Sequence, residues 1–198
     1  MRRTRLCLLC IAILTLCISA FPLETRADDS LIIPGERIGD ISLTMSMDDV
    51  LKTLGPPSQV QRLDESVRYD WGNKQIRVVQ SLDTGVIVSV RTYWVVRAAK
   101  SGGSTLVPNP YRTEKGIGIG ATPEQVRRAY GDAGCFTKEF SSPRGKSREF
   151  LWFEMGITFL VATDPLSPSE IRDKVREIGV RRKGGRGRGP GEGYTQCT

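Results

Sequence analysis

One short pattern occurs twice in this chain, and the repeat constrains the fold more than any other feature of the sequence. The segment Ser46–Gly55 (SMDDVLKTLG) aligns with Thr122–Gly131 (TPEQVRRAYG) at an offset of 76 residues, and Trp71 aligns with Trp152 at an offset of 81. A duplicated supersecondary unit buries its apolar face against its neighbour, and such proteins commonly serve as scaffolds or binding surfaces. The sequence therefore predicts two tandem units. Their predicted bounds are residues 28–97 and 113–180, with a linker rich in Gly, Ser and Pro at 98–112.

Each unit carries the signals of a short helix. Ser46 and Thr122 are residue types that cap helix N-termini, and Asp49 and Gln125 follow three residues later, as in a capping box. The glycine that closes each segment can adopt the left-handed conformation that ends a helix. We therefore expect an α+β fold in which each unit packs one short helix on a small antiparallel sheet.

Runs of β-branched and aromatic residues, separated by short turns, predict the strands of each sheet. The loop Lys138–Arg148 of the second unit is longer than its counterpart and rich in basic residues. The predicted strands are Val67–Trp71, Gln75–Gln80 and Val86–Val96 in the first unit, and Glu149–Phe153, Gly156–Ala162 and Lys174–Val180 in the second.

The first 27 residues have the pattern of a secretory signal peptide. Three arginines among residues 1–5 precede the uncharged apolar run Leu6–Ser19, and Ala27 is a suitable cleavage position. The alternative is an uncleaved anchor, although the apolar run is shorter than the ~20 residues of a spanning helix. Cys17 lacks the small residues that precede a lipid-modified cysteine. We expect an exported protein, periplasmic or secreted, without a lipid anchor and without a transmembrane span in the mature chain.

The positive charge of the chain lies at its two ends. The signal segment and residues 181–198 together hold nine of the 29 basic residues and two of the 22 acidic ones, so residues 28–180 are neutral. A nucleic-acid-binding domain carries its basic patch on the folded surface. The charge pattern therefore argues against nucleic-acid binding. It also predicts that residues 181–198, which are rich in Gly and Arg, form a disordered tail.

Histidine is absent and only two cysteines follow the signal segment, Cys135 and Cys197. In an oxidising compartment an even count favours a disulfide between them, and two free thiols are the alternative. Two cysteines so far apart do not form a zinc-binding pattern. The absence of histidine removes the commonest general base and metal ligand. The sequence thus predicts no cofactor, no metal site and no catalytic residues.

Two further motifs suggest chemistry at first sight. Residues Gly116–Gly120 alternate glycine and isoleucine before a helix, but the spacing is not that of a dinucleotide-binding loop. Asp48, Asp49 and Glu124 lie in the first turns of the predicted helices, where carboxylates complement the helix dipole. We interpret both features as structural and expect a protein that is not an enzyme.

The repeated helix, its glycine stop and the antiparallel strands after it resemble the BamE (SmpA/OmlA) family of outer-membrane assembly lipoproteins. They also resemble the tandem units of the β-lactamase inhibitor protein. The shared motif is carried here by Val50 with Gly55 and by Val126 with Gly131. This resemblance implies an α+β unit, present twice, with a binding surface and no catalysis.

The predicted function is non-catalytic protein–protein binding or envelope assembly, by an exported module of two repeats that resemble BamE and the inhibitor protein. The alternative is electrostatic binding of an anionic envelope polymer or lipid through the basic tail and the 138–148 loop. Exposed aromatic residues would anchor a protein partner, since aromatics dominate interface energetics. The candidate partner-binding residues are Tyr93, Trp94, Lys138, Arg144, Lys146, Arg148, Arg181, Arg182, Lys183, Arg186 and Arg188.

Overall fold

The computed structural model describes residues 29–98, 104–132, 135–142, 145–164, 167, 172–183 and 195–196. The predicted signal peptide (1–27) lies outside these ranges, as do Arg144, Arg186, Arg188 and Cys197. In the described ranges no helix has the length and apolarity to cross a membrane, and each of the two helices has eight residues.

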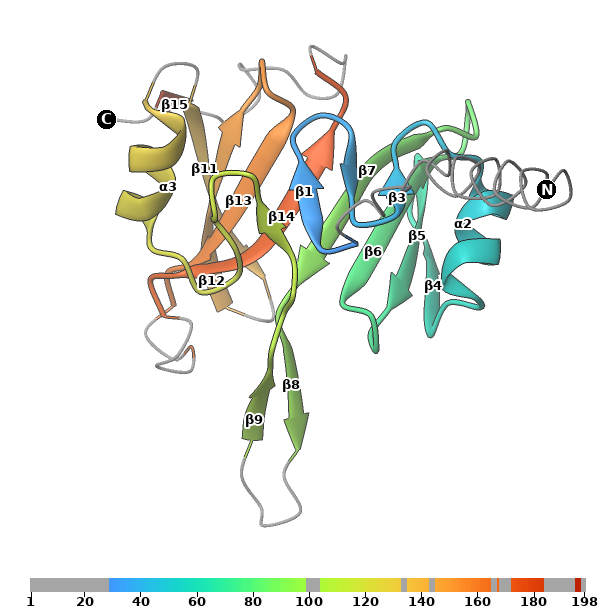
Figure 1. Cartoon of the computed structure of the whole chain (residues 1–198), viewed down its shortest axis with the longest axis horizontal. Helices are drawn as coiled ribbons and strands as arrows, with labels where there is room; N and C mark the ends of the chain where they lie inside the picture. Colours follow the sequence, from blue (N-terminus) through green and yellow to red (C-terminus); the bar gives the residue numbers. More distant parts are fainter. Residues whose placement is uncertain are drawn as a thin grey trace, which may run out of the picture.

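One continuous antiparallel sheet forms the body of the protein (Figure 1). Its eight longer strands run in the order β11-β12-β13-β14-β7-β6-β5-β4, and the two-residue β15 is added at the β11 edge. The strands are β4 (Gln59–Arg62), β5 (Ser66–Trp71), β6 (Ile76–Ser81), β7 (Ile87–Tyr93), β11 (Cys135–Ser142), β12 (Gly145–Trp152), β13 (Ile157–Ala162), β14 (Val175–Arg181) and β15 (Thr195–Gln196).

This sheet contradicts the predicted fold class of two units with a small sheet each. The last strand of the first half, β7, pairs with the last strand of the second half, β14, over five residue pairs. Val90 lies opposite Val180 and Thr92 opposite Ile178, all buried. Separate sheets would leave an unpaired edge at β7 and at β14 with these apolar side chains exposed. The two halves therefore merge into one β-rich sheet.

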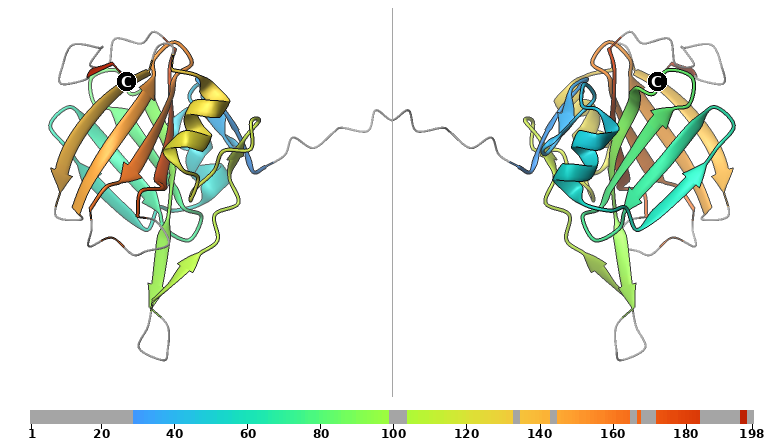
Figure 2. Two further views of the ribbon diagram at one scale, coloured as in Figure 1. Left: turned by 90° about the vertical axis from the view of Figure 1, so that its left-hand side faces the viewer. Right: turned by 90° about the vertical axis from the view of Figure 1, so that its right-hand side faces the viewer.

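The helices and a second, smaller sheet cover one face of the large sheet (Figures 1 and 2). Helix α2 (Met47–Leu54) lies over the first half and α3 (Pro123–Tyr130) over the second. Between them lies a four-stranded sheet in the order β10-β1-β2-β3. Its strands are β1 (Leu31–Ile33), β2 (Arg37–Ile38), β3 (Ile41–Ser42) and β10 (Arg112–Thr113), and β1 pairs with β10 in parallel.

The predicted helix caps are confirmed. The hydroxyl of Ser46 accepts a hydrogen bond from the backbone N–H of Asp49, and Thr122 forms a complete capping box with Gln125. Each helix ends at its glycine, where φ is +75° at Gly55 and +72° at Gly131. These values lie in the left-handed region that side chains with a Cβ disfavour.

Each helix is tied to the sheet by an equivalent tryptophan. The indole Nε1–H of Trp71 donates to the carbonyl oxygen of Gly55 at 2.9 Å, and that of Trp152 donates to Gly131 at 3.0 Å. Both tryptophans are fully buried. A helix of two turns has little stability of its own, so packing and this buried bond hold its C-terminal end in place.

Several strands were missed from the sequence. The loop expected at Lys138–Arg148 is instead the hairpin of β11 and β12, and β4 was not predicted. The predicted strand Val86–Val96 is interrupted at Trp94 and continues as β8 (Val95–Ala98). Within the tail expected to be disordered, Thr195 and Gln196 pair with β11.

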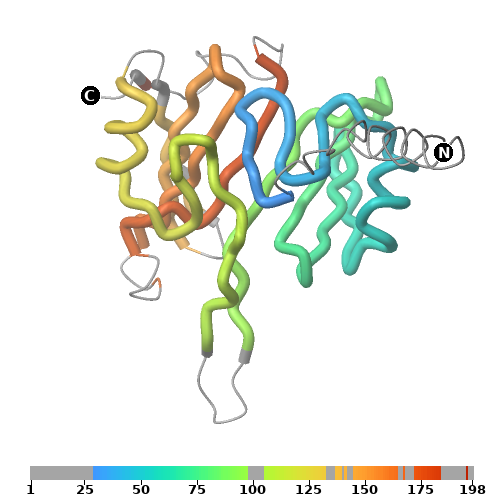
Figure 3. Tube along the Cα trace, in the orientation of Figure 1, coloured from blue at the N-terminus to red at the C-terminus, as the bar shows by residue number. Residues whose placement is uncertain are grey.

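Residues 98–112, expected to be a linker, contain β9 (Ser104–Val107), which pairs antiparallel with β8. The backbone trace in Figure 3 leaves the body after β7, runs outward along β8 and returns along β9 to β10. The ribbon of β8 and β9 projects away from both halves of the sheet, and we call it the arm (Figures 1 and 2).

The tryptophan tie gives a first prediction. Replacement W152F leaves the carbonyl of Gly131 without its donor and removes buried volume, so we expect the free energy of unfolding to fall by about 1–3 kcal/mol. Urea unfolding monitored by circular dichroism measures the change. W94F is the matched control, because Trp94 is only half-buried. An equal loss in both variants would contradict the role of the indole bond.

Candidate functional site

A line of alternating charges crosses the face of the sheet opposite the helices. Side chains alternate along each strand, so residues next to the buried apolar positions of β5, β6, β7, β14 and β12 point to this outer face. We call this line the charged ladder. Its members are Arg68, Asp70, Arg77, Glu177, Arg91, Glu149 and Arg181.

The first half of the ladder is built around Asp70. Its carboxylate accepts from Arg68 Nε at 3.0 Å and from Arg77 Nε at 2.7 Å. Arg77 then reaches across the sheet, and its Nη1 lies 3.2 Å from an oxygen of Glu177. The ladder therefore crosses from β5 and β6 to β14 and connects the two halves of the sheet.

The second half of the ladder centres on Arg91. Its Nη1 donates to Glu177 at 2.6 Å, and its Nη2 lies 3.8 Å from Glu149. Arg181 approaches Glu149 from the other side at 3.7 Å. Gly179 lies beneath this crossing, and a Cβ there would come within 3.2 Å of Arg91 Cγ and 2.7 Å of Thr158 Oγ1. A glycine at this position leaves room for the arginine.

The carboxylates of the ladder are largely buried, and each lies beside two arginines. The exposed fraction is 6% for Asp70, 8% for Glu149 and 9% for Glu177. Burial would raise the pKa of Glu177, but Arg91 and Arg77 outweigh it and hold that pKa below the ordinary value. In the described part of the chain no group of three or more His, Cys, Asp or Glu side chains could hold a metal ion. The ladder supplies fixed charge and register rather than a ligand set.

Tyr93 and Trp94, predicted to bind a partner, lie where the ladder meets the arm. The guanidinium of Arg77 stands 4.8 Å from the ring centroid of Tyr93, a cation–π contact. Burial raises the pKa of the Tyr93 hydroxyl, and the Asp70 charge raises it further. The backbone N–H of Trp94 donates to the carbonyl of Arg176 at 3.0 Å. Both aromatic side chains are half-buried.

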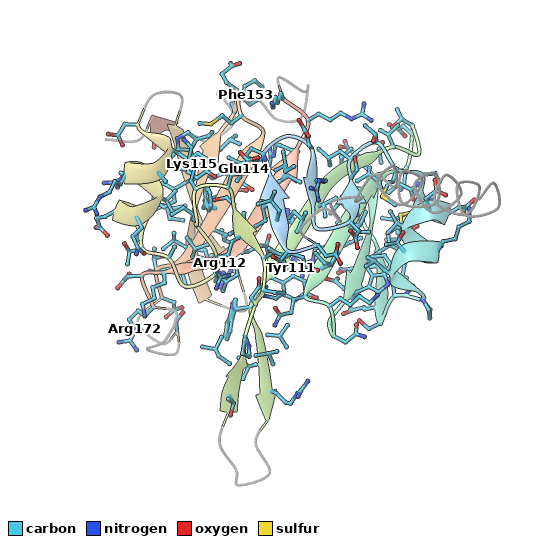
Figure 4. The ribbon with its side chains drawn as sticks, in the orientation of Figure 1. Tyr111, Arg112, Glu114, Lys115, Phe153 and Arg172 are labelled. Carbon is cyan, nitrogen blue, oxygen red and sulfur yellow. The ribbon has the colours of Figure 1, made fainter. Side chains whose placement is uncertain are left out.

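A buried polar cluster of Gln75, Thr92 and Asn109 fixes the base of the arm. The backbone carbonyl of Gln75 accepts from Thr92 Oγ1 at 2.9 Å, and Asn109 Nδ2 donates to the same Oγ1 at 2.8 Å. Asn109 Oδ1 accepts from the backbone N–H of Tyr111 at 3.0 Å. Figure 4 labels Tyr111 where the chain re-enters the body above the arm. The three members are at most 8% exposed.

The predicted basic residues do not form one patch. Lys138 lies opposite Glu149 in the hairpin of β11 and β12, whereas Arg148 lies opposite Glu139 one pair further on. Adjacent pairs face opposite sides of a sheet, so these two side chains diverge. Arg148 donates to Glu139 at 2.8 Å, and Arg181 belongs to the ladder.

The remaining predicted residues are scattered or lie outside the described ranges. Lys146, Arg182 and Lys183 are exposed. Arg144, Arg186 and Arg188 are outside the described residues, so their part in binding stays a prediction. The predicted disulfide is also untested, because Cys197 lies outside the described ranges and for Cys135 only the backbone is described, at the start of β11.

Sequence reasoning missed six of the seven members of the ladder and included Arg181 only as part of the tail. A signal was present in the strand alternation. Arg68 and Asp70 occupy alternate positions beside Tyr69 and Trp71, and Arg77 lies between the buried Ile76 and Val78. Alternation shows that such residues share one face of the sheet. It does not show which strands are neighbours, and the β7–β14 pairing was not predicted.

Comparison with known proteins identifies no family. No protein family matches the sequence, and no curated protein matches it either. Among solved structures, the chain is similar to a cysteine-rich secretory protein from Staphylococcus aureus, with 17% sequence identity and a TM-score of 0.40. The similarity covers 79% of this chain and 49% of that protein, so the chain spans about half the length of the relative.

The predicted resemblance to the BamE family and to the inhibitor protein is wrong, because the fold differs from the one it implies. The structure is a largely β protein with one large antiparallel sheet rather than a pair of α+β units. The helix cap and glycine signals on which the resemblance depended describe two local helix ends. Such signals recur wherever a short helix is capped, so they do not define a family.

The ladder gives a prediction with a defined pH dependence. The pKa of Glu177 is lowered in the folded state, so its ionised carboxylate stabilises the folded protein. This contribution to the free energy of unfolding is complete above the unfolded-state pKa of about 4.3 and is lost as the pH falls through the folded-state pKa. Replacement E177Q should lower the free energy of unfolding by about 3 kcal/mol near neutral pH, since it leaves Arg77 and Arg91 without their shared carboxylate. Urea unfolding at a series of pH values measures the difference in free energy of unfolding between the unchanged protein and E177Q. We expect this difference to become smaller at acidic pH.

Glu139 is the matched control, because it also pairs with an arginine in a strand but its side chain is 67% exposed. E139Q should cost less than about 1 kcal/mol at any pH, as surface ion pairs do. If E139Q and E177Q cost the same, or if the loss in E177Q does not depend on pH, the ladder does not stabilise the junction as described.

The pairing of β15 with β11 supports a prediction for the two cysteines. Phe136 pairs with Gln196, and Cys135 and Cys197 are their neighbours in sequence. We expect peptide mapping of the oxidised protein to recover these cysteines in one disulfide-linked peptide. We expect C135S to lower the free energy of unfolding by roughly 4 kcal/mol, as the chain-entropy model gives for a loop of this size. Recovery of two free thiols in the exported protein would contradict it.

Proposed function

We propose that this chain is an exported, non-catalytic protein-binding module. One observation carries the proposal: a β-ribbon projects from a rigid sheet next to two half-buried aromatic side chains, Tyr93 and Trp94. Aromatic residues on a stable scaffold contribute most of the energy in many protein interfaces. The secretory pattern of residues 1–27 supports export.

The chemistry of the ladder also favours binding over catalysis. Asp70, Glu149 and Glu177 each lie beside two arginines. A general acid or base needs a pKa near the working pH, whereas the pKa of Glu177 is lowered. Carboxylates held in this way are suited to fixing the geometry of the sheet and the electrostatic field around the arm.

The second candidate is electrostatic attachment to an anionic polymer or lipid through basic side chains. The exposure of Lys146, Arg182 and Lys183 favours it. Against it, Arg148 and Arg181 already pair with Glu139 and Glu149, and Lys138 and Arg148 face opposite sides of the sheet. We therefore place the binding surface on the folded body.

The two candidates predict different responses to salt. The test is a pull-down from envelope extract with the exported chain and with a variant in which four basic residues of the 181–198 segment are changed to serine: R182S, K183S, R186S and R188S. This variant keeps Arg181 in the ladder. For a binding module on the folded body, we expect the same protein to be retained by both chains at low and moderate salt, because short-range apolar contacts are not screened.

Loss of retention in the serine variant, or in moderate salt for both chains, would overturn the proposal in favour of electrostatic attachment. A second control is the double variant Y93A and W94A, which should reduce retention while the tail is intact. Unchanged retention in that variant would remove the two aromatic residues from the binding surface.

A further inference from the structure

We propose that the arm is a rigid insertion element that enters an apolar cleft bordered by carboxylates on a partner protein. The inference rests on the proposed function and specifies which part of the chain binds and what chemistry the partner offers. The described residues of the arm are Val95–Ala98 in β8 and Ser104–Val107 in β9.

The arm is a ribbon with apolar side chains on both faces. Its register pairs Val95 with Val107, Val96 with Leu106 and Arg97 with Thr105. Alternation therefore places Val96 and Leu106 on one face, and Val95 and Val107 on the other together with Arg97 and Thr105. Val96 is 39% exposed, and Leu106 is half-buried.

A ribbon of this kind is incomplete without a partner. In the described part of the chain β8 and β9 pair only with each other, so each strand has an unpaired edge. An isolated two-stranded ribbon is marginally stable in water, and further burial of an apolar face is what stabilises it. Insertion between two walls of a cleft would bury both faces of the arm at once.

The residue that attaches the arm to the body has an unusual backbone conformation. Gln75, at the turn between β5 and β6, has φ of +57°, although it is not a glycine. The corresponding turn of the other half, 81 residues later, has Gly156 with φ of +68°. A Cβ at position 156 would collide with the carbonyl oxygen of Arg181 and with Gly35, so that turn requires glycine for space, whereas the first half accommodates a side chain at Gln75 despite its positive φ.

The side chain of Gln75 is used to hold the arm. It is 3% exposed, and its Nε2 donates to the carbonyl of Val107 at 3.2 Å, at the base of β9. Asn109 and Thr92 lie in the same buried cluster. Strain that is kept at one residue and paired with a specific contact commonly marks a functional element. A fixed arm loses less conformational entropy on binding, which increases affinity.

The charge of the arm and its unpaired strand edges together favour an acidic protein cleft over a bilayer interior. Residues 95–113 contain no Asp or Glu, and Arg97 on β8 is exposed. A cleft that receives this ribbon is complementary if carboxylates lie at its border. A bilayer interior is a poor alternative, because the unpaired backbone groups along both strand edges find no hydrogen-bonding partner in lipid.

The test uses the full exported chain with a photo-crosslinking residue at position 96, and matched chains with it at position 88 or 61. Val88 and Val96 are both 39% exposed, and Gln61 is an exposed residue of β4. Crosslinking in envelope extract and mass spectrometry identify the protein captured at position 96. Its affinity for the purified chain and variants is then measured by surface plasmon resonance.

We expect V96D to weaken binding at least about tenfold, because it places a charge on an apolar face and repels the acidic border. V88D should stay within about twofold. R97E should weaken binding about tenfold in low salt and less in high salt, whereas R62E on β4 should have little effect. Thermal unfolding of each variant shows whether the fold is intact.

The attachment is tested separately with Q75G. This variant removes the bond to Val107 together with the strain, so we expect amide hydrogen exchange to become faster in β8 and β9 than in the large sheet, with global stability measured alongside by urea unfolding. Its affinity for the captured protein should fall. Slow exchange and full affinity in Q75G would show that the arm is not held by this contact and would overturn the rigid-arm inference.

The other outcomes separate the inference from the proposed function. Equal effects of V96D and V88D on affinity would overturn the inference that the arm is the binding element, and so would a protein captured at position 61 but not at 96. Either result would leave the proposed protein-binding function standing. No protein captured at any position would overturn both. Vesicles of phosphatidylglycerol and phosphatidylethanolamine provide the lipid probe, and binding to them that is lost in V96D would replace the cleft with a membrane surface.

Discussion

The pairing of β7 with β14 determines most of the structure. Each half alone would be a four-stranded sheet with one covered face and an open edge, which is a small core for a stable protein. The register that places Val90 opposite Val180 and Thr92 opposite Ile178 buries these side chains under β1–β3. The same register brings Glu177 beside Tyr93 and Gly179 beside Arg91 on the outer face. One interaction therefore joins the cores, assembles the ladder and positions the arm.

The ladder is better understood as a device for register than as a source of stability. The attraction within a buried ion pair does little more than offset the free energy of desolvating its two charges. Apolar residues of similar size often stabilise a protein equally well. A slip by one residue between β7 and β14 would move Arg91 away from Glu177 and turn the apolar side chains of β14 toward the outer face. It would also remove Gly179 from beneath the arginine. The cost of a misaligned junction is then several uncompensated buried charges, and one alignment becomes strongly preferred.

Local features of this fold could be predicted from the sequence and long-range ones could not. Ser46, Thr122 and the two glycines mark the helices because caps depend on neighbouring residues alone. On α2, Val50 is buried while Leu51 is 36% exposed, since the large sheet decides which side of the helix is covered. The β7–β14 pairing joins residues about 90 positions apart, and nothing local encodes such a contact. Tyr93 and Trp94 were selected for their chemistry, but the arm beyond them lay in a stretch whose Gly, Ser and Pro content suggested a linker.

The two halves provide an internal control for the assignment of function. Positions that serve the fold agree between them: the capped helices, their glycine stops and the indole bonds of Trp71 and Trp152. The halves differ at the equivalent turn residues Gln75 and Gly156, and packing accounts for the glycine, because a Cβ there would collide with Arg181 and Gly35. Gln75 has a positive φ although it is not a glycine, and its side chain donates to the carbonyl of Val107 at the base of the arm. The strain at Gln75 therefore accompanies a specific contact, and the arm is the part of the molecule that this residue holds.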